Sequence, residues 1–201
     1  MKMTSLDRVL ILLTGLLAAY QIVVGIDKMD NVPIIAYTIA FGVLLVAGLL
    51  LIILGFDVLD SSTVVIISTI IPLALATGLV YQHLASFRTP YLLFAIIGFS
   101  AVIFTRSIQM QNKLPVFTIA IVHGIAGMTI FLLPLIASIQ GQTRPLFSLV
   151  GVGGALIGIG GMLLSFLKTG RPILSRETIF KVLPSLLLLM TICFVAGFKY
   201  G

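Results

Sequence analysis

Long apolar runs separated by short polar connections dominate the pattern along this chain. A helix needs about 20 mostly apolar residues to cross the hydrocarbon core of a bilayer. By this criterion we expect seven transmembrane helices, at 7–26, 33–55, 63–84, 90–106, 115–138, 145–167 and 178–198. Because the connections leave no room for a separate soluble domain, the pattern predicts an all-α polytopic membrane protein, a seven-transmembrane-helix bundle that forms a single domain over residues 1–201.

Proline lies inside the third, fifth and seventh of these spans. In the third span, Pro72 has no N–H, so one backbone hydrogen bond of the helix is missing there. Ser68, Thr69 and Thr77 are close enough along the chain to hydrogen-bond the groups that the proline frees. We therefore expect a kink in the third span.

The composition agrees with a membrane protein, because 60% of the residues are hydrophobic and 9% are charged, with a mean hydropathy of +1.26. Short cytoplasmic connections of membrane proteins are enriched in Lys and Arg. In the expected topology, the membrane side that holds the N-terminus carries more Lys and Arg than the opposite side. The residues on the N-terminal side are Lys2, Arg8, Arg106, Lys113, Lys168, Arg171, Arg176 and Lys181, and those on the opposite side are Lys28, Arg88, Arg144 and Lys199. This bias predicts an N-in, C-out orientation, in a cytoplasmic or thylakoid-like membrane.

The sixth span carries an unusual row of small residues. Gly151, Gly154, Gly158 and Gly161, followed by Ser165, recur at steps of three and four residues and so fall on one face of a helix. Glycine lowers helix stability in water, whereas in a membrane helix it lets another surface approach closely. The row therefore predicts a packing seam, on which a neighbouring helix, a partner subunit or a planar cofactor could lie.

Two histidines are the candidate cofactor ligands. His123 follows Pro115 by eight residues, or about 12 Å of helical rise, which places it near the middle of the membrane. Gly124 and Gly127 beside it would leave space for the ring of a haem or a chlorophyll. Alternatively, the imidazole is neutral and bonds a Thr, a Ser or a backbone carbonyl of a neighbouring span. His83 is expected at the outer boundary, so a single haem shared by both histidines is disfavoured.

Nothing in the sequence indicates catalysis. The acidic residues all fall in connections or at span ends, where they cannot serve as buried proton relays: Asp7, Asp27, Asp30, Asp57, Asp60 and Glu177. The motifs of intramembrane metalloproteases and serine hydrolases are missing as well. An enzyme is therefore the less favoured interpretation.

Three functions fit these observations. The first is an accessory or scaffolding subunit of a larger membrane assembly of the respiratory or photosynthetic type, packing through the glycine-rich sixth span. The second is a haem- or chlorophyll-binding electron-transfer protein that uses His123, with His83 as a further ligand. The third is a carrier of a small neutral solute or a lipid, hinged at its intramembrane prolines. Expected partners are membrane lipids and other membrane subunits or a second copy. Nucleic acid is excluded because the basic residues are dispersed.

Some transporters consist of two similar groups of three spans joined by a single span, and seven spans could in principle follow this pattern. The first and last spans are faintly alike, since each begins with a basic residue and two aliphatic ones at Arg8 and Lys181. The middle spans do not align, and the prolines do not recur at matching positions. The sequence therefore does not predict an internal repeat.

Overall fold

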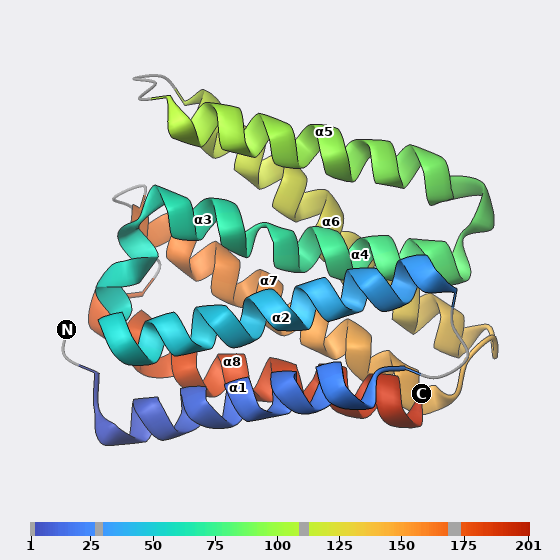
Figure 1. Ribbon diagram of the computed structural model, residues 1–201, viewed down its shortest axis with the longest axis horizontal. Coiled ribbons are helices and arrows are strands. Elements are labelled where there is room, and N and C mark those ends of the chain that lie inside the picture. The colour runs from blue at the N-terminus through green and yellow to red at the C-terminus, as the bar shows by residue number, and fades with distance from the viewer. Residues whose placement is uncertain (1–2, 27–29, 109–112, 169–173) are drawn as a thin grey trace.

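The computed structural model describes residues 3–26, 30–108, 113–168 and 174–201, except for the side chains of residues 165, 166 and 168. These residues form a bundle of helices that lie roughly side by side (Figure 1). In chain order the helices are α1 (Ser5–Val24), α2 (Asn31–Leu54), η1 (Phe56–Asp60), α3 (Ser62–Ser68), α4 (Ile70–His83), η2 (Ala85–Phe87), α5 (Arg88–Ser107), α6 (Leu114–Ile139), η3 (Pro145–Phe147), α7 (Ser148–Lys168) and α8 (Arg176–Tyr200). The three η segments are short 3-10 helices.

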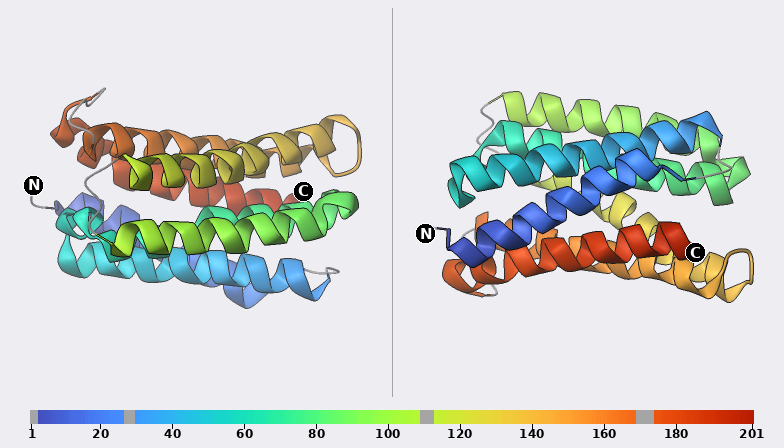
Figure 2. Two further views of the ribbon diagram at one scale, coloured as in Figure 1. Left: turned by 90° about the horizontal axis from the view of Figure 1, so that it is seen from above. Right: turned by 60° about the horizontal axis from the view of Figure 1, so that its bottom comes forward.

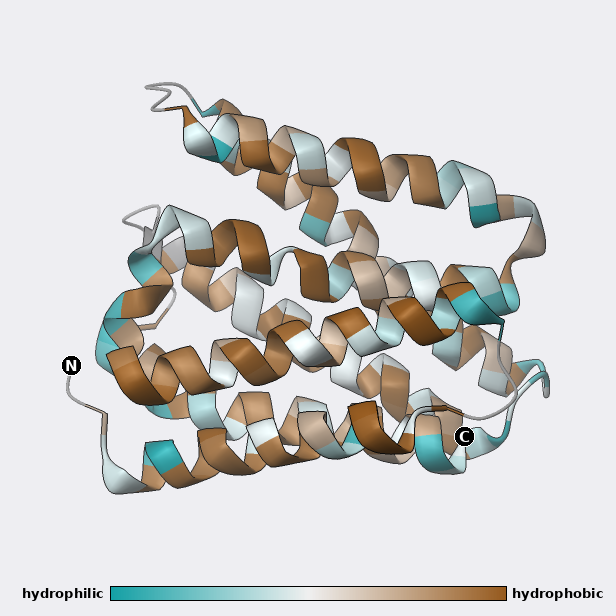
Figure 3. Ribbon diagram, viewed as in Figure 1, coloured by the Kyte–Doolittle hydropathy of each residue, from teal (hydrophilic) through white to brown (hydrophobic). Residues whose placement is uncertain are grey.

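Within the described residues, seven helical stretches are long and apolar enough to cross a membrane, so the prediction of seven spans is confirmed. They are Ser5–Val24, Asn31–Leu54, Ser62–His83, Ala85–Ser107, Leu114–Ile139, Pro145–Leu164 and Arg176–Tyr200. In Figure 3 hydrophobic residues cover the length of the helices, whereas hydrophilic residues gather toward their ends. This distribution is that of an integral, multi-pass membrane protein.

The N-in, C-out orientation rests on the distribution of Lys and Arg alone and stays a prediction. Of the residues in that comparison, Lys2, Lys28, Arg171 and the side chain of Lys168 lie outside the described residues. The two ends of the bundle are therefore named here by the chain termini. The N-terminal end is where α1, α3, α6 and α8 begin, and the C-terminal end is where α1, α4, α6 and α8 finish (Figure 1).

Six spans form a closed ring, and one lies outside it. Going round the ring, α1 packs against α2, α2 against α4, α4 against α6, α6 against α7, α7 against α8, and α8 against α1. The remaining span, α5, packs on the outside against α3, α4 and α6 (Figures 1 and 2). The first three and the last three spans thus follow one another round the ring in equivalent order, although the sequence shows no repeat.

The ring encloses an apolar core. Its larger part, which includes the buried side chains of Phe41, Leu79 and Phe194, joins α2, α4, α6 and α8. A second cluster fills the N-terminal end, where the ring of Phe56 stacks on that of Phe180 at 4.9 Å between centroids. Phenylalanine pairs of this kind bury large apolar surfaces and fix helix positions by shape.

Polar side chains tie the ends of the bundle together. Arg176 of α8 forms an ion pair with Asp60 at 3.0 Å. The carboxylate of Asp7 accepts a hydrogen bond from the backbone N–H of Thr4 at 2.8 Å, and the Thr4 hydroxyl accepts one from the backbone of Asp7 in return. Asp7 therefore lies at a span end, as expected, but it is a buried residue that caps its helix.

The third span is divided into two helices, although the backbone of Thr69 between them keeps right-handed helical angles, with φ −64° and ψ −24°. It consists of α3 and α4, which are separated at Thr69, three residues before Pro72. The hydroxyls of Ser68 and Thr69 both donate to the carbonyl of Val65, at 3.0 and 2.8 Å, and Thr77 donates to the carbonyl of Leu73. The helix assignment thus breaks close to the proline, while the expected kink stays a prediction. The three hydroxyls do not bond the carbonyl of Ser68, which is the one that Pro72 leaves without a donor.

Candidate functional site

The first half of α7 lies directly against α6 through two of the expected glycines. A methyl group at Gly151 would lie 2.7 Å from the carbonyl oxygen of Phe131, and one at Gly154 would lie 2.7 Å from Cγ2 of Ile130. Both distances are shorter than any normal van der Waals contact. These two glycines therefore allow the backbones of α6 and α7 to approach closely, as small residues do in membrane helices.

A second row of glycines on α7, which the sequence analysis did not single out, lies against α8. A methyl group at Gly153 would lie 2.7 Å from the ring of Phe194, and one at Gly160 would lie 3.0 Å from Leu186. Gly197 of α8 approaches α7 in the same way, within 2.8 Å of the backbone nitrogen of Val150. Helix α7 is thus packed closely on two sides, between α6 and α8.

The second half of α7 is different, because Gly158 and Gly161 are exposed and have open space where a side chain would be. The last member of the expected row, Ser165, belongs to α7, but its side chain lies outside the described residues. On α6, Gly124 and Gly127 also have open space at the side-chain position. We call these four glycines, Gly124, Gly127, Gly158 and Gly161, the open glycine surface.

Helical register places the two halves of this surface opposite one another. On α7, Gly158 lies one turn after Gly154 and on the same face, which is the face that meets α6. On α6, Gly127 lies one turn before Phe131 and on the same face, which is the face that meets α7. Helices α6 and α7 meet at the C-terminal end and separate toward the N-terminal end (Figure 1). The open glycine surface therefore lies where two adjacent helices diverge.

His123 belongs to α6 and immediately precedes this surface. Its Nδ1 atom is 3.2 Å from the carbonyl oxygen of Ile119 in the same helix. In the alternative without a cofactor, the imidazole was expected to bond a neighbouring span; the observed partner is instead a backbone carbonyl of α6 itself. Among the described residues, the other ring nitrogen, Nε2, has no hydrogen-bond partner. His123 is partly exposed and could present this atom to a ligand.

His83 lies elsewhere, as the last residue of α4 at the C-terminal end. Its ring packs against Phe147, with 5.1 Å between centroids, and its Nε2 atom is buried with no hydrogen-bond partner in the part of the chain that the structure describes. From His123 to the end of α6 is about 24 Å of helical rise, so the two histidines do not lie at one level. The structure brings His123, and not His83, next to open glycines.

A buried polar contact beside His83 was missed by the sequence analysis. The hydroxyl of Tyr37 on α2 donates to the side-chain oxygen of Gln82 on α4. The Tyr37 ring packs against Gly78, where a methyl group would lie 2.5 Å from Cε1 of the ring. Tyr37 also packs on Phe198, at 4.6 Å between centroids. The sequence signal was weak, because a tyrosine near a span end is normally an interfacial anchor.

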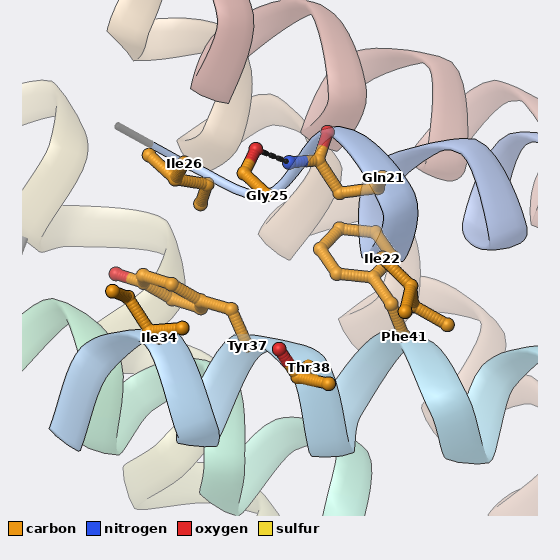
Figure 4. Close-up of a pocket in the computed structure, with 8 residues that line it drawn as sticks. All are labelled: Gln21, Ile22, Gly25, Ile26, Ile34, Tyr37, Thr38 and Phe41. Atoms are coloured by element: carbon orange, nitrogen blue, oxygen red, sulfur yellow. Dashed lines mark hydrogen bonds between the residues drawn. The ribbon is translucent and has the colours of Figure 1, made fainter. Parts of the chain in front are cut away.

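A small pocket lies next to Tyr37, between the end of α1 and the start of α2 (Figure 4). Its volume is about 10 Å³, which is roughly the space that one water molecule needs. Gln21 closes one side by donating from its amide nitrogen to the carbonyl of Gly25 at 3.0 Å. The pocket therefore cannot hold a cofactor ring in this conformation.

Over the described ranges, no group of three or more His, Cys, Asp or Glu side chains is placed to hold a metal ion. Comparison with known proteins adds no relative: no protein-family model, no curated protein and no solved structure matches this chain. Its function must therefore be argued from its own residues.

Proposed function

We propose that this chain is an accessory integral-membrane subunit that holds a transmembrane helix of a larger membrane assembly against the open glycine surface. The observation that supports the proposal is the contrast along α7. Gly151, Gly153, Gly154 and Gly160 are each used for close contact with a neighbouring helix, whereas Gly158 and Gly161 meet no other atoms. Glycine reduces helix stability without such a contact, so an external helix would give these positions the same role.

The surface also has the shape that helix docking requires. It is built by two helices that diverge, and its exposed borders are apolar side chains such as Ile125, Met128, Ile159 and Met162. Helices associate in a membrane by close packing rather than by excluding water, so small residues flanked by larger apolar ones provide a groove and ridges for a partner. A respiratory or photosynthetic assembly is the class of partner that the sequence analysis favoured.

The proposal is tested by Gly158→Leu, with Gly42→Leu as a matched control. Both glycines have open space at the side-chain position, and Gly42 lies on α2, away from α6 and α7. We expect neither variant to lower the melting temperature, because both positions have open space and leucine is the better helix former. Tagged protein should be extracted gently from its native membrane, and the complex measured by native gel and mass spectrometry. Gly158→Leu should lose co-purifying subunits that Gly42→Leu retains. Equal retention by both variants would contradict the proposal.

A second candidate, binding of a haem or a chlorophyll, is favoured by His123. Its Nε2 atom has no partner among the described residues, and Gly124 and Gly127 beside it leave open space. An imidazole nitrogen with no hydrogen bond is available to coordinate the iron of haem or the magnesium of chlorophyll.

The cofactor candidate is tested by the absorption spectrum of the gently solubilised protein, recorded across its size-exclusion peak. A Soret or chlorophyll band that co-elutes with the wild type and disappears in His123→Ala, but not in His83→Ala, would support it. A band that survives His123→Ala would show that His123 is not the ligand. If only protein absorbance is present, the accessory proposal stands without this candidate.

A further inference from the structure

A groove between α1 and α8 lies at the C-terminal end, on the opposite side of α8 from the glycines of α7. Its volume is about 200 Å³, and it is lined by Leu17, Tyr20, Ile192, Val195, Ala196, Lys199 and Tyr200. The right-hand view of Figure 2 shows α1 and α8 diverging toward the C-terminal end, which opens the groove. Its walls are apolar along the helices, and its polar groups are gathered at one end.

The polar end of the groove is a pre-arranged cationic site. The ammonium group of Lys199 donates to the hydroxyl oxygen of Tyr20 at 2.7 Å. It also lies 5.3 Å from the centre of the Tyr20 ring and 5.4 Å from that of Tyr200. Three contacts thus hold the flexible lysine side chain over the groove. The ammonium group also interacts with the hydroxyl of Tyr200. Because an ammonium group has three N–H donors, at least one is left for a ligand, and the Tyr20 hydroxyl keeps its own hydrogen for donation.

The depth of this site suits a lipid headgroup. Helix α8 has 25 residues and therefore spans about 37 Å, against about 30 Å for the hydrocarbon core of a bilayer. A helix of this length centred in a bilayer extends beyond the hydrocarbon at both ends, which would put Lys199, the penultimate residue of α8, at headgroup level and Ile192 and Leu17 further in. Tyrosine and lysine are typical of this boundary.

We propose that the groove between α1 and α8 binds an anionic phospholipid, with the phosphate group on Lys199 and Tyr20 and the start of an acyl chain along Leu17 and Ile192. Charge complementarity selects this occupant. Among the described residues that line the groove, Lys199 is the charged one, and its ammonium group still has an N–H to donate. A phosphate oxygen accepts strong hydrogen bonds from both an ammonium and a phenol. The inference concerns α1 and α8, so it stands or falls separately from the open glycine surface.

The test is native mass spectrometry of the full chain in detergent, titrated with phosphatidylglycerol or with phosphatidylcholine. Because a lysine at a membrane surface contributes a several-fold attraction for an anionic headgroup, we expect wild type to bind phosphatidylglycerol about five-fold more tightly. Lys199→Gln should remove this preference. The control is Arg144→Gln, an exposed basic residue at the same end that does not line the groove, and it should keep the preference.

Tyr20→Phe provides an independent variant, because it keeps the ring but removes the hydroxyl that holds Lys199. We expect it to lower the preference to between that of wild type and that of Lys199→Gln. Equal binding of the two lipids by wild type, or equal loss in Lys199→Gln and Arg144→Gln, would overturn the proposal. It would also be overturned if Lys199→Gln changed the size of the particle and left lipid binding unaltered, since the groove would then be an interface between copies.

Discussion

The packing of α7 predicts opposite outcomes for two substitutions one helical turn apart, Gly154→Ala and Gly158→Ala. At Gly154 the added methyl would lie 2.7 Å from Cγ2 of Ile130, 2.9 Å from its carbonyl carbon and 3.0 Å from the backbone nitrogen of Phe131. Two of these atoms are backbone and cannot rotate away, so α6 and α7 must move apart. At Gly158 the methyl would meet nothing within 4 Å.

The magnitude follows from comparing the two variants. Alanine is preferred over glycine inside a helix by roughly 0.5–1 kcal/mol, and this gain is common to both positions. Overpacking against a fixed neighbour costs about 1–3 kcal/mol, and this loss applies only at Gly154. The difference between the two variants should therefore be about 1–3 kcal/mol, with Gly158→Ala the more stable. For a chain of this length that corresponds to a separation of roughly 2–12 °C in melting temperature.

The assay is thermal unfolding of both variants and wild type in the same detergent, followed by circular dichroism and by loss of the monodisperse size-exclusion peak. Comparing two variants of one helix cancels the intrinsic preference for alanine and isolates the contact with α6. Equal melting temperatures for Gly154→Ala and Gly158→Ala would refute the reasoning, because the close approach of the two backbones would then carry no free energy.

Three further outcomes are expected in the same assay. Tyr37→Phe should lower the free energy of unfolding by about 0.5–1.5 kcal/mol, because the hydrogen bond from the Tyr37 hydroxyl to Gln82 is lost; an unchanged melting temperature would show that this hydrogen bond does not contribute. His83→Phe should leave stability unchanged or raise it by about 1–3 kcal/mol, since it keeps the packing on Phe147 and removes an unpartnered buried nitrogen; a marked loss would indicate that this nitrogen has a partner. Asp60→Asn should cost less than about 1 kcal/mol, because its ion pair is exposed, and the effect should shrink further in high salt.

Hydropathy was sufficient to predict the spans, since an apolar run of the right length has few alternatives to a membrane helix. It could not predict that α5 lies outside the ring. In a membrane, lipid-facing and helix-facing positions are both apolar, so Leu93, Ile96 and Ile97, which are all more than half exposed, look the same in sequence as buried core residues. Only the pairing of helices distinguishes them.

The glycines of α7 also show that a sequence pattern does not reveal which helix a given face contacts. Their spacing correctly marked a face of the helix, and Gly151 and Gly154 lie against α6. The spacing did not reveal that Gly153 and Gly160 form a second contact on another face, or that Gly158 and Gly161 meet nothing. Periodicity identifies a face of a helix but not its neighbour. The bond between Tyr37 and Gln82 was beyond reach for a related reason, because it joins residues 45 positions apart.

The interrupted third span bears on the carrier hypothesis, the third of the functions that the sequence allowed. Pro72 leaves the carbonyl of Ser68 without its backbone donor, a loss of about 0.5–1.5 kcal/mol. Pro72 itself is buried on α4, whereas none of the seven residues of α3 is buried. Spans that are broken within the membrane also form the substrate sites of many transporters, and the carrier hypothesis rests on this analogy alone.

Pro72→Ala tests whether the break in the third span is a hinge needed for transport or a feature without a functional role. The substitution restores an N–H that can donate to the carbonyl of Ser68, so α3 and α4 can join into one helix, and the melting temperature should rise by roughly 1–6 °C. If the break is a hinge, proteoliposomes containing the wild type should pass small neutral solutes faster than empty liposomes in a light-scattering assay, and the more stable variant should be slower. A fall in melting temperature would mean that packing requires the break. A rise with no solute flux in either protein would leave the break without a transport role and favour the accessory subunit.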